Sequence, residues 1–290
     1  MSGKGVEMKV HYLDCGVLYP LAATSFMQYL AKCTCLCMLL EVGEQLVLVD
    51  TGISVKDIKD IEGIRRLGHT NIILDSFFDN IIRSAQKTMN PDQTAIRQVE
   101  SLGFRAEDVM HIICTHLDFD HAGGLCDFPH AQVHVLHTEY EAALKPRGFR
   151  ERERYRQHYF THGPNWRTYK ETSKEPWFGM DCIRELDGLP PEIILVPLYG
   201  HTRGHCGVAV QTEEGWILHC GDAYYVRREL EEGKKVPFGI TCTRLMVDHD
   251  FAGVRRQRER LKELARKSGG EITMYATHVN DQPVPLFTSI

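Results

Sequence analysis

The sequence predicts a mixed α/β fold that contains both hairpins and helices connecting strands. Four short runs rich in Val, Ile, Leu or aromatic residues, each bounded by turn residues, are typical of buried strands. Between them, apolar residues recur at helical spacing behind capping residues. The expected strands cover residues 45–49, 109–115, 193–198 and 216–220, with a weaker fifth at 272–277.

Three segments carry helix signals. An Asn-Pro pair at Asn90 provides an N-cap and a first-turn proline, and Gly103 ends that helix. A second helix is expected over residues 138–144, opened by a Thr and a Glu three positions later. Asp250 is the expected cap of a third helix, whose basic last turn suits the helix dipole.

The composition is that of an ordinary globular chain. It has 290 residues, of which 43% are hydrophobic and 25% charged, with a net charge of −5. These values exclude collagen-like, coiled-coil and wholly disordered chains, and they give no support to nucleic-acid binding. The longest strongly apolar run, residues 33–40, is far below the roughly 18 residues of a membrane span. We expect one domain over residues 1–290, with no membrane partner; a homodimer is left open.

Ten cysteines are present, and none forms a paired CxxC motif. Cys33, Cys35 and Cys37 alternate along an apolar strand, while others lie beside strand segments. Reduced thiols packed in the core of a cytoplasmic protein are therefore expected.

Metal-competent side chains follow four of the expected strands. In α/β sheets, ligand sites gather beyond the carboxyl ends of strands, so these side chains are expected to form one site. Imidazole nitrogen and carboxylate oxygen suit Zn, Fe or Mn, and a bridging carboxylate can hold two ions. For the cluster of Asp118, Asp120 and His121, the alternative is a polar loop closed by an Ala-Gly-Gly turn. The metal-competent side chains that follow these strands belong to His116, Asp118, Asp120, His121, His201, Asp222 and His278.

The segment THLDFDHAGGL resembles the HxHxDH signature of the metallo-β-lactamase fold superfamily. Further motifs follow in that family's order: DTG at Asp50, GHTRGH at His201, GDA at Asp222 and THVND at His278. Within the superfamily, the HTEYEAAL segment and the DAYY run are most similar to the N-acyl-homoserine lactone lactonases. Those enzymes place a tyrosine three residues after the bridging aspartate, which here is Tyr225.

The resemblance implies an αββα sandwich, in which two mixed sheets pack face to face with helices outside. It also implies two divalent metal ions, with zinc the foremost candidate. The Asp50 carboxylate would orient a metal-binding histidine without itself binding a metal. By this resemblance the first ion takes His116, Asp118 and His201, the second takes Asp120, His121 and His278, and Asp222 bridges both.

Position 118 departs from the family pattern, because the family has histidine where this chain has Asp118. The added carboxylate lowers the formal charge of a dinuclear site from +2 to +1, which favours Mn or Fe relative to Zn. A carboxylate oxygen of Asp sits at the same δ position as the nitrogen that the histidine would use. We therefore expect Asp118 to be a working ligand. The alternative is a first metal site that is weak or missing.

The expected function is a dinuclear metal-dependent hydrolase that opens a lactone or another small carboxylic ester with a metal-bridged hydroxide. Tyr225 would stabilise the oxyanion and Asp120 would shuttle the proton. Two alternatives stay open. One is a glyoxalase II-like thioesterase or a phosphoester hydrolase of the same fold. The other is a non-catalytic metal- or ligand-binding protein with an altered first metal site.

An insertion rich in aromatic and charged residues is expected at about residues 146–180. Its first half reads as a solvated, charged helix. Its tryptophan-containing second half is expected to cover the site, because aromatic and Arg side chains favour interfaces.

Overall fold

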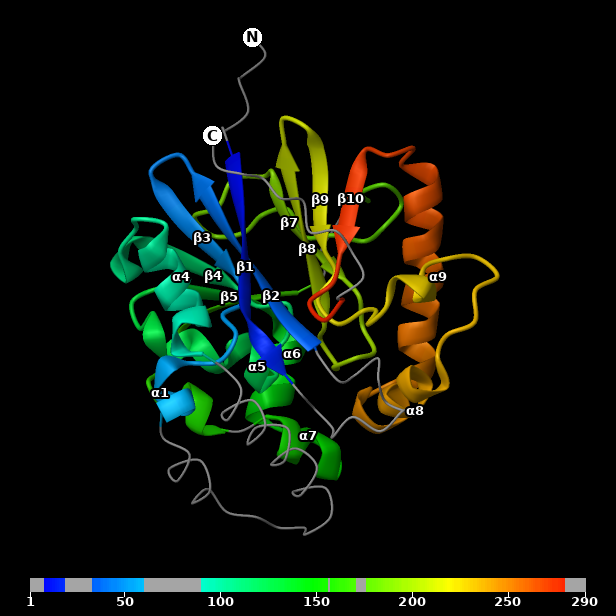
Figure 1. Cartoon of the computed structure of the whole chain (residues 1–290), viewed down its shortest axis with the longest axis horizontal. Helices are drawn as coiled ribbons and strands as arrows, with labels where there is room; N and C mark the ends of the chain where they lie inside the picture. Colours follow the sequence, from blue (N-terminus) through cyan, green and yellow to red (C-terminus); the bar gives the residue numbers. More distant parts are fainter. Residues whose placement is uncertain (1–7, 19–32, 60–89, 156, 171–175, 280–290) are drawn as a thin grey trace.

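The computed structural model describes residues 8–18, 33–59, 90–155, 157–170 and 176–279. Within these ranges, two sheets form the centre, one of six strands and one of four (Figure 1). The first has the order β1-β2-β3-β4-β5-β6 and the second β10-β9-β8-β7. The first sheet contains β1 (Met8–Leu18), β2 (Cys33–Val42), β3 (Gln45–Val49), β4 (Val109–Ile113), β5 (Gln132–Leu136) and β6 (Asn165–Tyr169). The second contains β7 (Ile193–Pro197), β8 (Cys206–Thr212), β9 (Gly215–His219) and β10 (Ile272–Tyr275).

Both sheets are mixed. In the first, β1, β2 and β3 pair antiparallel, whereas β3 to β6 pair parallel. In the second, β7, β8 and β9 pair antiparallel and β10 runs parallel to β9. Antiparallel neighbours need only short turns, while parallel neighbours need crossovers. The combination of hairpins and crossovers expected from the sequence is therefore confirmed.

The two sheets pack face to face because their strands are apolar on both sides. On β2, Met38 and Leu40 lie in the cluster between the sheets with Leu195 and Val208, while Leu39 faces the helices. This alternation follows the two-residue period of a strand. Burial on both faces explains why such strands read as nearly continuous apolar runs.

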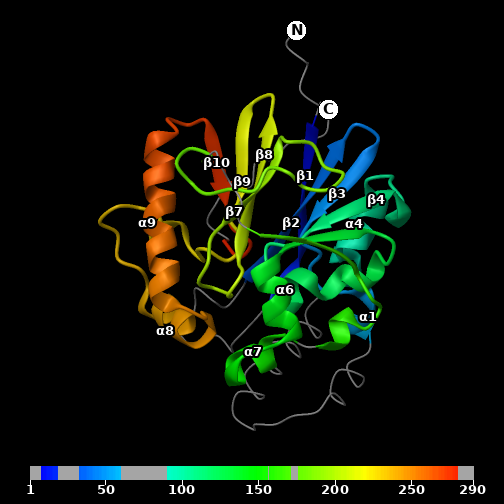
Figure 2. The same ribbon diagram turned by 180° about the vertical axis from the view of Figure 1, so that it is seen from behind.

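Helices cover the outer faces of the sandwich (Figure 1, Figure 2). Leu261 and Leu264 of α9 pack against Ile194 and Leu218 of the second sheet. Helices α4 and α6 lie on the side of the first sheet. The αββα architecture is thus confirmed. The α-helices in the described ranges are α1 (Val55–Lys59), α4 (Ala95–Ser101), α5 (Phe119–Ala122), α6 (His137–Leu144), α7 (Gly148–Arg154), α8 (Phe238–Val247) and α9 (Phe251–Lys267).

The starts of two expected helices differ from the structure. The Asn90 side chain caps a 3₁₀ turn over Pro91–Gln93, and α4 begins only after Thr94, whose extended backbone interrupts the turn. Helix α6 begins at His137, one residue before the expected opening. Asp250 is the N-cap of α9, as predicted. No helix in the described ranges is long and apolar enough to cross a bilayer.

The described parts of the segment around residues 146–180 differ from both expectations. Glu151 and Arg154 of α7 are buried, so the helix is not simply a solvated one. The cover expected of the tryptophan loop is wrong for Trp177, which lies in the core of the second sheet with its ring centroid 5.3 Å from that of Trp216. Burying a large apolar ring in the core stabilises the fold more than leaving it over a polar site.

Candidate metal centre

Seven side chains that follow strands β4, β7, β9 and β10 converge at one edge of the sandwich. The loop after β4 and the short helix α5 carry four of them. The segment that follows each of the other three strands carries one. Nε2 of His201 lies 3.2 Å from Oδ2 of Asp118, and Nε2 of His278 lies 3.2 Å from Oδ2 of Asp222. Nε2 of His121 lies 3.3 Å from the other oxygen of Asp222. The structure therefore brings together every residue that the sequence singled out: His116, Asp118, Asp120, His121, His201, Asp222 and His278.

Potential ligand atoms form three groups, two of which share His116, and the atoms of each group lie within 4.8 Å of one another. One group is the set expected for the first ion: His116, Asp118 and His201. The set expected for the second ion is divided between two groups. His121 falls with His116 and Asp222, whereas Asp120 and His278 fall with Cys35. The sequence had placed Cys35 among core thiols, and only the fold brings the start of β2 beside His278.

All four imidazoles are anchored through Nδ1, which directs Nε2 to the centre of the cluster. An outer partner on the second ring nitrogen is the usual arrangement around metal-binding histidines, because it fixes the tautomer and the ring orientation. The Nδ1 partners are Thr115 Oγ1 for His116 (3.0 Å), Asp50 Oδ2 for His121 (2.8 Å), Asp248 Oδ1 for His201 (2.9 Å) and the Thr34 carbonyl for His278 (2.6 Å).

Several buried polar atoms in the cluster have no hydrogen-bond partner among the described residues. They include Nε2 of His116, Nε2 of His121, Oδ1 of Asp118 and Oδ1 of Asp222. The 3.3 Å contact between His121 and Asp222 is an ion pair without hydrogen-bond geometry. A buried donor or acceptor without a partner costs about 1–3 kcal/mol, so native folds rarely leave several together. Imidazole nitrogens and carboxylate oxygens are ligands for Zn, Mn or Fe. The donor set therefore fits a metal centre.

The local charges keep the carboxylates ionised. Burial alone would raise the pKa of Asp222, but the imidazoles of His278 and His121 outweigh burial and hold it well below its usual value. Burial would lower the pKa of His121, yet Asp222 and Asp50 raise it well above the ordinary value. The negative carboxylates and the imidazoles thus stabilise each other's charged forms, as expected in a site that binds cations.

Two loops that carry these residues are tied together by Glu139 of α6, whose role the sequence did not reveal. One carboxylate oxygen accepts the Leu117 N–H (3.0 Å), and the other accepts the Gly204 N–H and the Thr202 hydroxyl (both 2.8 Å). A Cβ on Gly204 would lie 2.2 Å from the backbone nitrogen of Glu139, so only glycine allows this approach. Tyr155 also donates to Glu139 (3.0 Å).

Tyr225 lies beside the cluster, as expected. Its ring centroid is 5.8 Å from that of His278, and its hydroxyl is 3.4 Å from Nδ1 of His201. The guanidinium of Arg244 sits 4.1 Å above the ring. Burial raises the pKa of Tyr225 well above its usual value, so the phenol keeps its proton at neutral pH. Tyr224 is fully buried in the core of the second sheet.

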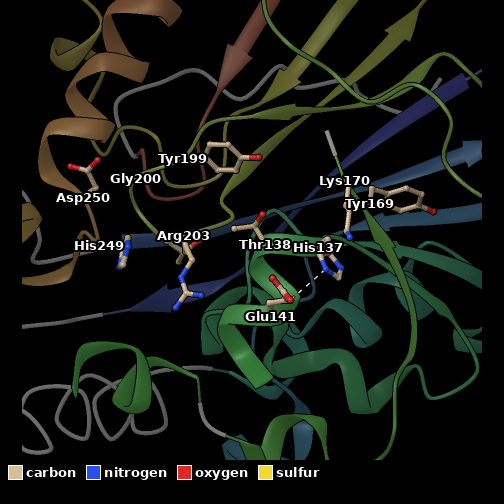
Figure 3. Close-up of a pocket in the computed structure, with 11 residues that line it drawn as sticks. His137, Thr138, Glu141, Tyr169, Lys170, Tyr199, Gly200, Arg203, His249 and Asp250 are labelled. Carbon is tan, nitrogen blue, oxygen red and sulfur yellow. Dashed lines mark ion pairs between the residues drawn. The ribbon is translucent and has the colours of Figure 1, made fainter. Parts of the chain in front are cut away.

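The pocket drawn in Figure 3 lies behind the loop that carries His201 and has a volume of about 640 Å³. Helix α6, the end of β6, the loop after β7 and the start of α9 line it, and none of the seven clustered residues does. Its lining includes both signs of charge, with His137, Arg203 and His249 drawn near the acidic Glu141 and Asp250. The pocket is therefore a neighbour of the candidate centre and not its opening.

Two mixed sheets between helices, with imidazoles and carboxylates gathered at the strand ends, define an αββα protein with a site of the metal-binding type. The model of the metallo-beta-lactamase superfamily matches residues 30–270, and the chain belongs to that superfamily.

Two relatives by sequence differ in their similarity to this chain. A protein of Mycobacterium tuberculosis named as a probable metallo-hydrolase is 36% identical over 280 residues, which cover 97% of this chain and 83% of that protein. An N-acyl homoserine lactonase of Bacillus thuringiensis is 29% identical over 205 residues, covering 70% of this chain and 68% of the lactonase.

Solved structures confirm the fold. An N-acyl homoserine lactone hydrolase, determined with the product N-hexanoyl-L-homoserine at its catalytic metal centre, superposes with a TM-score of 0.67 at 22% identity and covers 96% of both chains. A dizinc quorum-quenching lactonase superposes with a TM-score of 0.61 at 15% identity, covering 97% of this chain and 90% of the lactonase.

Proposed function

We propose that this protein is a metal-dependent hydrolase that opens a lactone, or a related small carboxylic ester. One observation carries the proposal. Four imidazoles anchored through Nδ1 present Nε2 to a cluster that also holds three carboxylates. The similarity to metallo-hydrolases and to N-acyl homoserine lactonases supports the reaction class.

In this proposal two divalent ions, zinc foremost and Mn or Fe as alternatives, share the cluster. His116, Asp118 and His201 would hold one ion, Asp120, His121 and His278 would hold the other, and Asp222 would be available to both. When bound, such ions polarise a carbonyl group and lower the pKa of water towards about 7.

The protein's own groups then orient the substrate and move one proton. Tyr225 keeps its proton because burial raises its pKa, so its hydroxyl donates a hydrogen bond to the oxygen of the substrate carbonyl as negative charge develops there. Asp120 is 8% exposed and lies 3.3 Å from His278. Its carboxylate accepts a proton from the attacking water and returns it to the departing alkoxide oxygen.

The choice of a lactone over other acyl substrates rests on Tyr225 and on the lactonase relatives. In this proposal the phenol of Tyr225, which lies beside the cluster, would donate to the carbonyl oxygen of a small lactone ring. Thioesters and phosphoesters would use the same ligands, and they are the competing substrates that the test includes.

A substrate panel tests the proposal. The purified chain, loaded with Zn²⁺ or Mn²⁺, is incubated with N-acyl-homoserine lactones of several acyl lengths, γ-butyrolactone, an aryl ester, a thioester and a phosphodiester. We expect lactone opening, seen as the ring-opened acid by mass spectrometry. Turnover should be lost in Asp120→Asn and retained in His130→Ala, which changes an exposed histidine outside the cluster. Hydrolysis of the thioester or phosphodiester alone would contradict the lactone assignment.

A further inference from the structure

The last residue of α7, Arg154, reaches from the 146–180 segment into the candidate metal centre. Its side chain is only 6% exposed. Nε lies 3.3 Å from Oδ1 of Asp118, Nη1 donates to the carbonyl of His201 (2.7 Å), and Nη2 donates to the carbonyl of Val247. Three contacts fix the planar guanidinium in one orientation, which a lysine ammonium could not match.

Because of this contact, the two carboxylate oxygens of Asp118 have different neighbours. Oδ1 faces Arg154, while Oδ2 lies 3.2 Å from Nε2 of His201 and 3.4 Å from Nε2 of His116. One oxygen therefore faces the guanidinium in an ion pair that lacks hydrogen-bond geometry, and the other is presented to the position that His116, Asp118 and His201 surround. A single oxygen presented in this way occupies the place of a single imidazole nitrogen.

Arg154 also offsets the charge that Asp118 introduces. Two divalent ions with five histidines and two aspartates carry a formal charge of +2, and the exchange of one histidine for Asp118 reduces it to +1. A buried guanidinium in contact with that carboxylate returns the local total to +2. Nearby charge matters strongly here because the site is buried and poorly screened.

We propose that Asp118 and Arg154 act together as one neutral unit in place of the histidine of the HxHxDH signature, with Arg154 as a positioning residue for the Asp118 ligand. The proposal rests on the metal centre of the proposed function and deepens it. The two residues then depend on each other. An imidazole at 118 suits a neutral residue at 154, and a carboxylate at 118 suits an arginine.

A purely structural role for Arg154 gives a different expectation. Its hydrogen bonds to the carbonyls of His201 and Val247 also hold α7 against the loops after β7 and α8. If this were its only role, the effect of replacing Arg154 would not depend on residue 118. The sign of the coupling between the two positions therefore distinguishes the two roles.

The test is a double-mutant cycle on metal affinity. The metal-stripped full chain is titrated with Zn²⁺ in competition with a chromophoric chelator, for the native protein, Arg154→Gln, Asp118→His and the double variant. Arg154→Gln should weaken Zn²⁺ binding about 10-fold, within the range typical of partners behind metal ligands. Asp118→His should also weaken it about 10-fold or more, because Arg154 is then an unbalanced cation beside the ions. Adding Arg154→Gln to Asp118→His should restore about 10-fold of that loss.

Three further variants complete the experiment. Arg154→Lys should retain part of the affinity with Asp118 and give no recovery with Asp118→His. Arg203→Gln removes a nearby arginine that pairs with Glu151 and not with Asp118, and it should change Zn²⁺ affinity less than threefold. Circular dichroism establishes that each variant is folded. If Asp118→His is not, Asp118→Asn replaces it in the cycle, with the same reversal of sign expected.

A loss of the same factor on replacing Arg154 in both backgrounds would overturn the proposal, and so would a chain that binds no Zn²⁺ in any variant. Failure of the proposed hydrolase function can be distinguished from failure of the Asp118–Arg154 pairing. Zn²⁺ binding with the predicted reversal, but no lactone opening, would contradict only the hydrolase. Lactone opening with additive effects would contradict only the pairing of Asp118 with Arg154.

Discussion

Oδ2 of Asp50 lies 2.8 Å from Nδ1 of His121, and both side chains are buried. The same carboxylate accepts the N–H and the hydroxyl of Thr115, each at 2.8 Å. Asp50 also adopts a left-handed backbone conformation, with φ of 57°, at the end of β3. A non-glycine residue in that conformation is unusual and is retained where the surroundings require it.

Asp50 should therefore control metal affinity without being a ligand. We expect Asp50→Ala to weaken Zn²⁺ binding about 10- to 100-fold, because His121 loses the partner that fixes its ring. Equilibrium titration of the metal-stripped variant measures the change, with the exposed Asp92→Ala as the matched control. Unchanged affinity in Asp50→Ala would show that His121 is oriented without it.

Tyr225 should act on the chemical step more than on binding. We expect Tyr225→Phe to lower kcat for lactone opening about 100-fold with little change in KM, since the lost hydrogen bond forms fully only as the oxyanion develops. Steady-state kinetics give both constants. A change confined to KM would instead assign Tyr225 to substrate binding.

Glu139 should matter for stability as well as for the geometry of the centre. Its carboxylate accepts hydrogen bonds from two loops, and Glu139→Gln turns part of that acceptor into a donor facing N–H groups. We expect a loss of about 3 kcal/mol in the free energy of unfolding, measured by urea denaturation. Glu141→Gln on the same helix should cost less than about 1 kcal/mol, because Glu141 is exposed. Equal losses in the two variants would contradict this role.

A buried histidine pair makes stability depend on pH away from the centre. Nδ1 of His111 lies 2.9 Å from Nε2 of His134, and burial together with His111 lowers the pKa of His134 to about 3. In the unfolded chain this pKa is about 6.5. Between these values the unfolded state binds about one more proton, so the free energy of unfolding contributed by His134 falls as the pH drops from 6.5 towards 3.

The measurement uses metal-free protein, so that release of metal ions does not contribute to the pH dependence of unfolding. Urea unfolding at several pH values should show a shallower decline in His134→Gln than in the native chain, by about one proton. The exposed His130→Gln should leave the slope unchanged. A decline that is the same in all three proteins would contradict the assignment to His134.

Much of the fold and of the centre follows from local sequence signals. Strand β3 has the predicted bounds, and His201 and Asp222 follow strands as expected, because short apolar runs and the loops after them are local features. Strands β1, β5, β6 and β8 were not predicted. For the edge strand β6 the reason is that its residues are only partly buried and carry a weak pattern.

The residues that contact and orient the metal-ligand candidates could not be predicted from local sequence signals. Arg154 lies in a run of alternating charges that is typical of a solvated helix, and only the packing of α7 on the loop of His201 buries it. Glu139 and Asp248 look like ordinary helix residues until the fold places them against Leu117 and His201. Such partners are defined by contacts between distant segments, for which the sequence has no periodic signal.

The metal content of the chain tests the central claim most directly. Elemental analysis of protein purified without added metal or chelator should give two divalent ions per chain, and about one in Asp118→Ala. One ion or fewer in the native chain, not recovered when metal is added, would contradict a centre in which Asp118 is a working ligand.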